Sequence, residues 1–142
     1  MDREVVEQKL ESLRRCVQRV AAKCPADADT LAREVDLQDI VTLNLSRAVQ
    51  MCVDVGAHMI ASTETPAPAT MGQTFELLSQ KGILPEALAT RLQRAVGFRN
   101  IVIHNYEAID WQVVHALART HLDDFASFAR AIVEHLGKQP ET

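Results

Sequence analysis

Residues 36–61, DLQDIVTLNLSRAVQMCVDVGAHMIA, form the stretch that decides the fold of this chain. No proline interrupts it, and its apolar side chains recur at intervals of three and four residues, which is the period of one helix face. The stretch therefore predicts one long amphipathic helix that packs a continuous stripe against neighbouring helices. The stripe consists of Leu37, Val41, Leu45, Ala48, Cys52, Val55 and Met59.

The segment before this stretch predicts a helix over residues 2–23. Its apolar residues follow each other at intervals of four and three, and Asp2 is a suitable N-cap. Pro25 ends the helix, because the residue before a proline avoids the helical region. The stripe consists of Val6, Leu10, Leu13, Val17, Val20 and Cys24.

The segments after the stretch predict three more helices. Residues 62–69 contain two prolines and several Ser and Thr side chains, so they form a loop. A short helix over 70–80 is closed by Gly82, and the next helix begins with Pro85 in its first turn. The last helix is expected to run without a break over 110–136.

Together these segments predict an all-α fold, an up-and-down four-helix bundle with one additional short helix. Only 4% of the residues are aromatic within an apolar content of 47%, which favours helix-on-helix packing. At 142 residues the chain is expected to form a single domain over 1–137, followed by a flexible tail at 138–142.

Composition and charge exclude several classes of protein. The net charge of -4 argues against a general nucleic-acid coat protein, which should be basic. Cys16, Cys24 and Cys52 have no close spacing, so they predict free thiols in a reducing cytoplasm. The charged N-terminus and the lack of a long apolar run predict a cytoplasmic protein without a signal peptide or membrane span.

Residues 99–106, RNIVIHNY, group more usable chemistry than any other part of the chain. Arg99 offers a rigid fork of donors for phosphate, and His104 can exchange a proton near neutral pH. Asn100 and His104 are four residues apart and share a helix face, whereas Arg99 and Tyr106 are seven apart and nearly align. The four side chains are therefore expected to converge on one ligand, especially if the helix ends near His104.

This combination predicts metal-independent cleavage of RNA, with no cofactor. His104 would act as general base or general acid, Arg99 would stabilise the charge on the phosphorane, and Asn100 would orient His104 or the phosphate. One histidine in the motif leaves one proton-transfer partner missing. A symmetric homodimer would supply it by bringing two copies to one cleft.

The residues leading into the motif favour an anionic ligand. No acidic residue occurs from Ala87 to Tyr106, while Arg91, Arg94 and Arg99 are all present. We therefore expect a local positive strip in which Arg91 and Arg94 bind RNA.

Several less specific interpretations stay open. Arg99 could pair with Glu107, His104 could be an ordinary helix-end histidine, and Tyr106 could be a packed ring with a hydrated hydroxyl. Asp54 and His58 are four residues apart and are interpreted as a supporting polar pair near the cleft rather than metal ligands.

The segment GFRNIVIHNY at residues 97–106, followed by Ile109-Asp110, resembles the signature of HepT-like proteins, a branch of the HEPN superfamily. That signature is an arginine, four residues, a histidine, one residue and a tyrosine, and Arg99, His104 and Tyr106 match all three positions. Upstream segments at 54–60, 75–78 and 81–85 extend the resemblance to most of the chain.

The resemblance implies the toxin ribonuclease of a two-gene, type VII-like toxin–antitoxin system. It also implies an all-helical homodimer whose RNA cleft lies at the subunit interface, with RNA, possibly tRNA, as substrate. The partner would be an MntA-like minimal nucleotidyltransferase antitoxin that transfers AMP from ATP to Tyr106. An adenylate there would place negative charge and bulk where the RNA phosphate should bind.

Two other functions remain as alternatives. One is a non-catalytic helical binding module that partners a nucleotidyltransferase, and the other is a purely structural helical dimer. The intact pair of Arg99 and His104 favours the ribonuclease, because a binding module has no need of it. The basic side of the first helix is expected to be solvated, or to dock RNA or antitoxin: Lys9, Arg14, Arg15, Arg19 and Lys23.

Overall fold

The computed structural model describes residues 2–139, and these residues form helices joined by turns and loops, with no strand among them. The predicted all-α fold class is confirmed. The elements in chain order are α1 (Arg3–Lys23), α2 (Ala28–Arg33), α3 (Val35–Ala61), α4 (Met71–Gln80), α5 (Glu86–His104), the 3-10 helix η1 (Tyr106–Ala108), α6 (Trp111–Thr120) and α7 (Asp123–Gly137).

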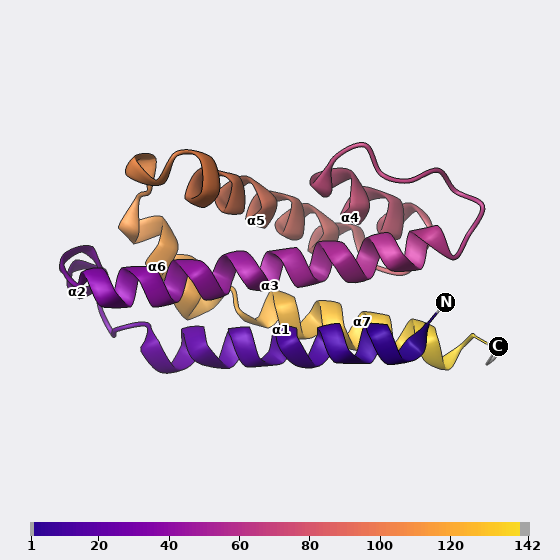
Figure 1. Cartoon of the computed structure of the whole chain (residues 1–142), viewed down its shortest axis with the longest axis horizontal. Helices are drawn as coiled ribbons and strands as arrows, with labels where there is room; N and C mark the ends of the chain where they lie inside the picture. The colour runs from indigo at the N-terminus through magenta and orange to yellow at the C-terminus, as the bar shows by residue number, and fades with distance from the viewer. Residues whose placement is uncertain (1, 140–142) are drawn as a thin grey trace.

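Helix α3 is the centre of the bundle. It packs along α1 and also contacts each of the other α-helices (Figure 1). Every position of the apolar stripe predicted for this helix is buried except Leu37, which is partly buried. The periodicity of one segment therefore predicted both the helix and the face that the other helices cover.

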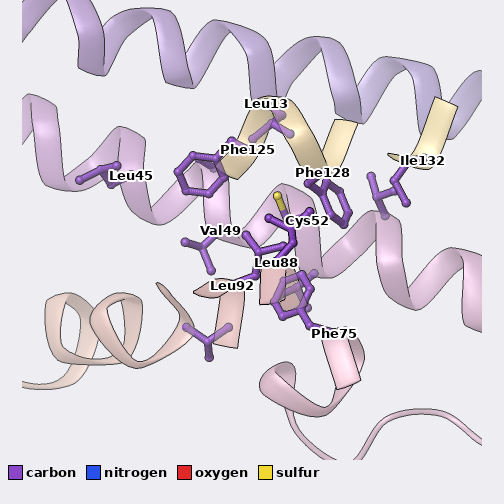
Figure 2. Close-up of a cluster of buried hydrophobic side chains, with 14 of the residues drawn as sticks. Leu13, Leu45, Val49, Cys52, Phe75, Leu88, Leu92, Phe125, Phe128 and Ile132 are labelled. Atoms are coloured by element: carbon purple, nitrogen blue, oxygen red, sulfur yellow. The ribbon is translucent and has the colours of Figure 1, made fainter. Parts of the chain in front are cut away.

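The core gathers side chains from all seven α-helices of residues 2–139, and Figure 2 shows one part of it. Phe75 of α4 and Phe128 of α7 meet edge to face, with ring centroids 6.2 Å apart, a favourable aromatic geometry. Leu88 and Leu92 bring the first half of α5 into the same cluster. This half of α5 is therefore anchored on both α4 and α3.

The close contact between α3 and α4 depends on Gly56. A Cβ atom at this position would lie 2.6 Å from Thr74 Cγ2 and 2.9 Å from Leu78 Cδ1. Helix α4 then ends in a turn at Gly82, whose φ of 74° is accessible to glycine at little cost. This turn directs the chain into α5, which begins after Pro85.

Four helix N-termini are capped by side chains, at Asp2, Asp27, Thr70 and Asp110. The Asp2 carboxylate accepts hydrogen bonds from the backbone N–H groups of Glu4 and Val5, as predicted, and Thr70 caps α4 through Gln73 N–H. The Arg3 guanidinium donates to the carbonyl oxygens of Leu136 and Gln139, at 2.6 and 2.7 Å, so the beginning of α1 is tied to the end of α7.

The prediction of one unbroken helix over 110–136 is wrong. The segment forms two helices, α6 and α7, which are separated at His121 and Leu122. The Thr120 hydroxyl donates back to the Ala116 carbonyl at 2.6 Å, a contact that bends helices. Asp123 and Asp124 then occupy the first turn of α7, where the helix dipole favours carboxylates. The break lets α6 pack on α2 while α7 packs on α1 and α5.

The short helix α2 was not predicted. Its Asp27 cap accepts from Thr30 N–H at 2.8 Å.

Other predictions from composition can be compared with the structure. The three cysteines are free thiols, as expected. Within residues 2–139 no helix is both long enough and apolar enough to cross a bilayer. Of the tail predicted at 138–142, residues 140–142 lie outside the described part of the chain.

Candidate functional site

The motif residues lie at the end of α5. The helix finishes at His104, and the Asn105 N–H donates the last helical hydrogen bond to the Ile101 carbonyl at 2.9 Å. Asn105 then leaves the helical region with φ −152°, and the chain forms η1 from Tyr106 onward. The turn redirects the tyrosine back toward α3.

Arg99 and Tyr106 line one groove between α3 and the end of α5, with a volume of about 490 Å³. The sequence therefore predicted correctly that these two side chains share a surface. Helix α3 supplies the other wall, and none of its residues was predicted as part of the site: Asp39, Thr42, Leu43, Ser46, Arg47 and Gln50.

The Arg99 guanidinium is held by neutral groups. One terminal nitrogen donates to Gln50 Oε1 at 3.1 Å and the other to Asn100 Oδ1 at 3.2 Å. Its Nε is buried and has no hydrogen-bond partner among the described residues. No ion pair with Glu107, the alternative left open by the sequence, is found in residues 2–139. The guanidinium is therefore positioned without being neutralised.

A chain of polar contacts continues from Arg99 across the bundle. Gln50 Nε2 donates to Asp54 Oδ1 at 2.8 Å, and Asp54 Oδ2 lies 3.6 Å from Lys9 Nζ on α1. Asp54 therefore supports the site, as the sequence suggested, but indirectly through Gln50. His58 does not take part in these polar contacts. Its Nε2 instead accepts a hydrogen bond from the Asp2 N–H at 3.3 Å.

Tyr106 combines a packed ring with a reachable hydroxyl. Its ring meets Trp111 edge to face at 6.0 Å, and its hydroxyl donates to Asp39 Oδ1 at 3.3 Å. The pKa of Tyr106 is raised above its ordinary value, mainly by burial and further by Asp39, while a hydrogen bond to Thr42 opposes the shift. The phenol is therefore neutral near pH 7.

Asn100 and His104 occupy a different strip of α5. Both are exposed, and five residues of helix turn His104 about 140° away from Arg99. Next to this strip, Ile103 and Leu43 expose 50% and 48% of their surfaces. A single chain therefore presents the arginine and the imidazole on different faces, joined by the contact between Arg99 and Asn100.

Arg91 and Arg94 are not brought together with Arg99. They line a second hollow of about 510 Å³ on the other side of α5, walled by α6 and α7. Arg91 also pairs with Asp124, at 2.9 Å from Nε to Oδ1. Their predicted role in RNA binding therefore has no support from proximity, and Arg47 of α3 is the arginine that shares the groove with Arg99.

Most of this chain is similar to known nucleases. The family model described as Ribonuclease HepT-like matches residues 4–132. The mRNA nuclease HepT of Shewanella oneidensis is 29% identical over 129 residues, covering 91% of this chain and 96% of that protein. The tRNA nuclease HepT of Aphanizomenon flos-aquae is 23% identical over 132 residues, covering 93% and 90%.

A solved structure has nearly the same fold. It is a tri-AMPylated Shewanella oneidensis HEPN toxin in complex with an MNT antitoxin, and it matches with a TM-score of 0.87 and 28% sequence identity. The match covers 94% of this chain and 99% of that chain.

Proposed function

This chain belongs to the HepT-like ribonuclease family, and we propose that it is a toxin that cleaves RNA with Arg99, Asn100 and His104. The resemblance predicted from the motif is confirmed at the level of the family. The observation that carries the proposal is the Arg99 guanidinium, which neutral partners hold at the edge of a groove. Such a cation keeps its full charge for a phosphate.

The roles of the three side chains follow from their chemistry. Arg99 binds the scissile phosphate and stabilises the charge that grows on it during attack by the 2′-hydroxyl. His104 moves a proton to or from the reacting oxygens. Asn100 accepts a hydrogen bond from Arg99 and leaves its amide N–H free for the substrate.

A second copy of the chain completes the site. Since Arg99 and His104 of one chain face different directions, a twofold arrangement through the strip with Leu43 and Ile103 brings the two motifs together. These exposed apolar side chains provide area that a homodimer would bury. The cleft would then contain two imidazoles, one as base and one as acid.

Control of the toxin would act through Tyr106. A relative of this chain is tri-AMPylated and in complex with an MNT antitoxin, and the single tyrosine of this chain lies in the groove. Transfer of AMP from ATP to the Tyr106 oxygen releases pyrophosphate and the phenol proton. It therefore removes the hydrogen bond that Asp39 accepts and adds a negatively charged phosphate. The negatively charged adenylate on Tyr106 would be repelled by Asp39 and attracted by Arg47 and Arg99. It would then occupy the position where the RNA phosphate binds.

Induced expression in a bacterial host tests the ribonuclease. The wild-type chain should arrest growth and fragment RNA, whereas His104→Ala should lose both effects because proton transfer contributes about 10²–10⁴-fold. His121→Ala serves as the matched control. It also removes an exposed histidine, but His121 follows α6 and lines the other hollow, away from the groove of Arg99. Full toxicity of His104→Ala would refute the assignment, and intact RNA with soluble wild-type chain would favour the binding module.

A nucleotidyltransferase partner and labelled ATP test the control mechanism. Label should enter the wild-type chain and not Tyr106→Phe, and the labelled chain should no longer cleave RNA. Equal labelling of Tyr106→Phe would place the modification elsewhere.

A further inference from the structure

A second groove, between α1 and α3, adjoins the Arg99 site. It has a volume of about 690 Å³, and Asp39, Leu43 and Arg47 line both grooves. Arg15 and Arg19 of α1 lie along its far wall. A polymer that binds at Arg99 therefore has a continuous path over α3 to α1.

Two cations of this path, Arg19 and Arg47, differ from Lys9 and Arg14 of α1 in their partners. Lys9 pairs with Asp54, and Arg14 pairs with Glu11 at 2.5 Å. Arg19 and Arg47, in contrast, have no carboxylate within 4.0 Å among residues 2–139. Arg15 is 3.4 Å from Glu11, the carboxylate that Arg14 already engages through two hydrogen bonds.

The charge of Arg47 acts inside the groove. The Cys16 thiol lines the groove beside it. Burial raises the pKa of that thiol, and the positive charge of Arg47 opposes the rise. The acidic residue of the path, Asp39, accepts the hydrogen bond from the Tyr106 hydroxyl. The cationic side chains therefore outnumber the carboxylate that the path contains.

We propose that this groove, formed by Arg15, Arg19 and Arg47, binds the phosphate backbone of the RNA strand on one side of the scissile bond. The proposal rests on the ribonuclease function proposed above and names where its substrate lies. Arg15 and Arg19 are one helical turn apart on one face of α1, so they can contact neighbouring phosphates. In a chain of net charge -4, a local row of guanidinium groups, two of which have no carboxylate partner among residues 2–139, is a site where a polyanion is attracted.

The test measures binding of a labelled single-stranded RNA to chains that carry His104→Ala, which prevents cleavage during the measurement. Arg19→Ala with Arg47→Ala should weaken binding about tenfold at low salt. It should also make the slope of log K against log salt shallower by about 1.4, since each lost single-strand contact removes about 0.7. With His104 restored, KM for RNA should rise more than kcat falls.

The matched control removes the same charge from other places. Arg33→Ala with Arg130→Ala replaces two exposed arginines outside this groove, and should leave RNA affinity and its salt slope unchanged. Circular dichroism melts of both double variants establish that each is folded.

Each contrary result has a separate meaning. If the His104→Ala chain binds RNA and the groove variant binds it with the same affinity and slope, the groove is refuted while the ribonuclease stands. If wild type neither binds nor cleaves RNA, the ribonuclease fails, and the groove fails with it. If the groove variant keeps RNA affinity and loses the nucleotidyltransferase instead, the groove is a protein interface and the proposal is wrong.

Discussion

The two halves of α5 have opposite environments. From Glu86 to Val96 the helix buries Leu88, Ala89, Leu92 and Val96, whereas no residue from Gly97 to His104 is buried. The first half fills the core, and the second carries Arg99, Asn100 and His104 of the motif. Because the helix is continuous, its buried first half holds the backbone of the second half in place. The motif side chains there are positioned without being part of the core.

The comparison shows that the residues that stabilise the fold and the residues proposed for catalysis lie in different halves of α5. Burial of an aliphatic side chain contributes about 1.5–3 kcal/mol to folding, and that gain is concentrated before Gly97. After it, the helix meets α3 through polar contacts such as that between Arg99 and Gln50. Changes in the second half should therefore affect activity with little loss of stability, and changes in the first half should do the reverse.

The largest expected effect sharpens this contrast in the second half. Arg99→Lys keeps the charge but removes the planar fork, so kcat for RNA cleavage should fall by about 10²–10³-fold, as for loss of a transition-state donor. The melting temperature should change little. A cleavage assay and a thermal melt on the same preparation measure both, and a variant as active as wild type would show that charge alone suffices.

The next effect concerns the first half. Leu92 is 1% exposed, so Leu92→Ala should reduce the free energy of unfolding by about 2–5 kcal/mol. Denaturant titration measures this loss, with Ala87→Gly as a control for the helix backbone, which should cost about 1 kcal/mol. At a temperature where the variant is folded, its kcat should stay close to that of wild type. A stable variant with greatly reduced kcat would contradict the separation.

A smaller effect is expected where the second half meets α3. Gln50→Leu removes the acceptor that positions Arg99 and the donor to Asp54, so kcat should fall about fivefold to tenfold. Gln50→Asn keeps the amide on a shorter side chain and should recover part of the loss. Unchanged cleavage by Gln50→Leu would mean that Asn100 alone positions the guanidinium.

The smallest effect is a titration. Tyr106 is the single tyrosine, so its ionisation can be followed by absorbance without interference from another phenol. Asp39→Asn should lower the pKa of Tyr106 toward its ordinary value of 10.0, while burial keeps it above that value. Because the folded pKa is raised, the stability linked to the neutral phenol is complete below pH 10 and is lost as the pH rises through the folded pKa. An unshifted midpoint would exclude Asp39 as a cause.

The sequence predicted the elements whose signals are local. The three-and-four spacing located α1 and α3, and Asp2 marked the beginning of α1. The placement of Arg99 and Tyr106 in one groove also followed from their spacing and from the end of the helix near His104.

Features that depend on pairing between distant segments could not be predicted. Gln50 and Asp39 reach the motif across 49 and 67 residues of sequence, and on α3 alone they look like ordinary polar positions. Arg91 looked like part of one strip with Arg99, but it pairs with Asp124 and lines the hollow walled by α6 and α7. The break at His121 likewise reflects what α6 and α7 pack against.

The contact of Arg3 with the carbonyl oxygens of Leu136 and Gln139 has a practical consequence for topology. It holds residues 3 and 139 next to each other, at the end of the bundle opposite η1 (Figure 1). A short linker could join them, and new ends could be opened in the 62–69 loop between α3 and α4. Such a circularly permuted chain would keep every helix intact, and it would allow fusion partners to be attached far from His104.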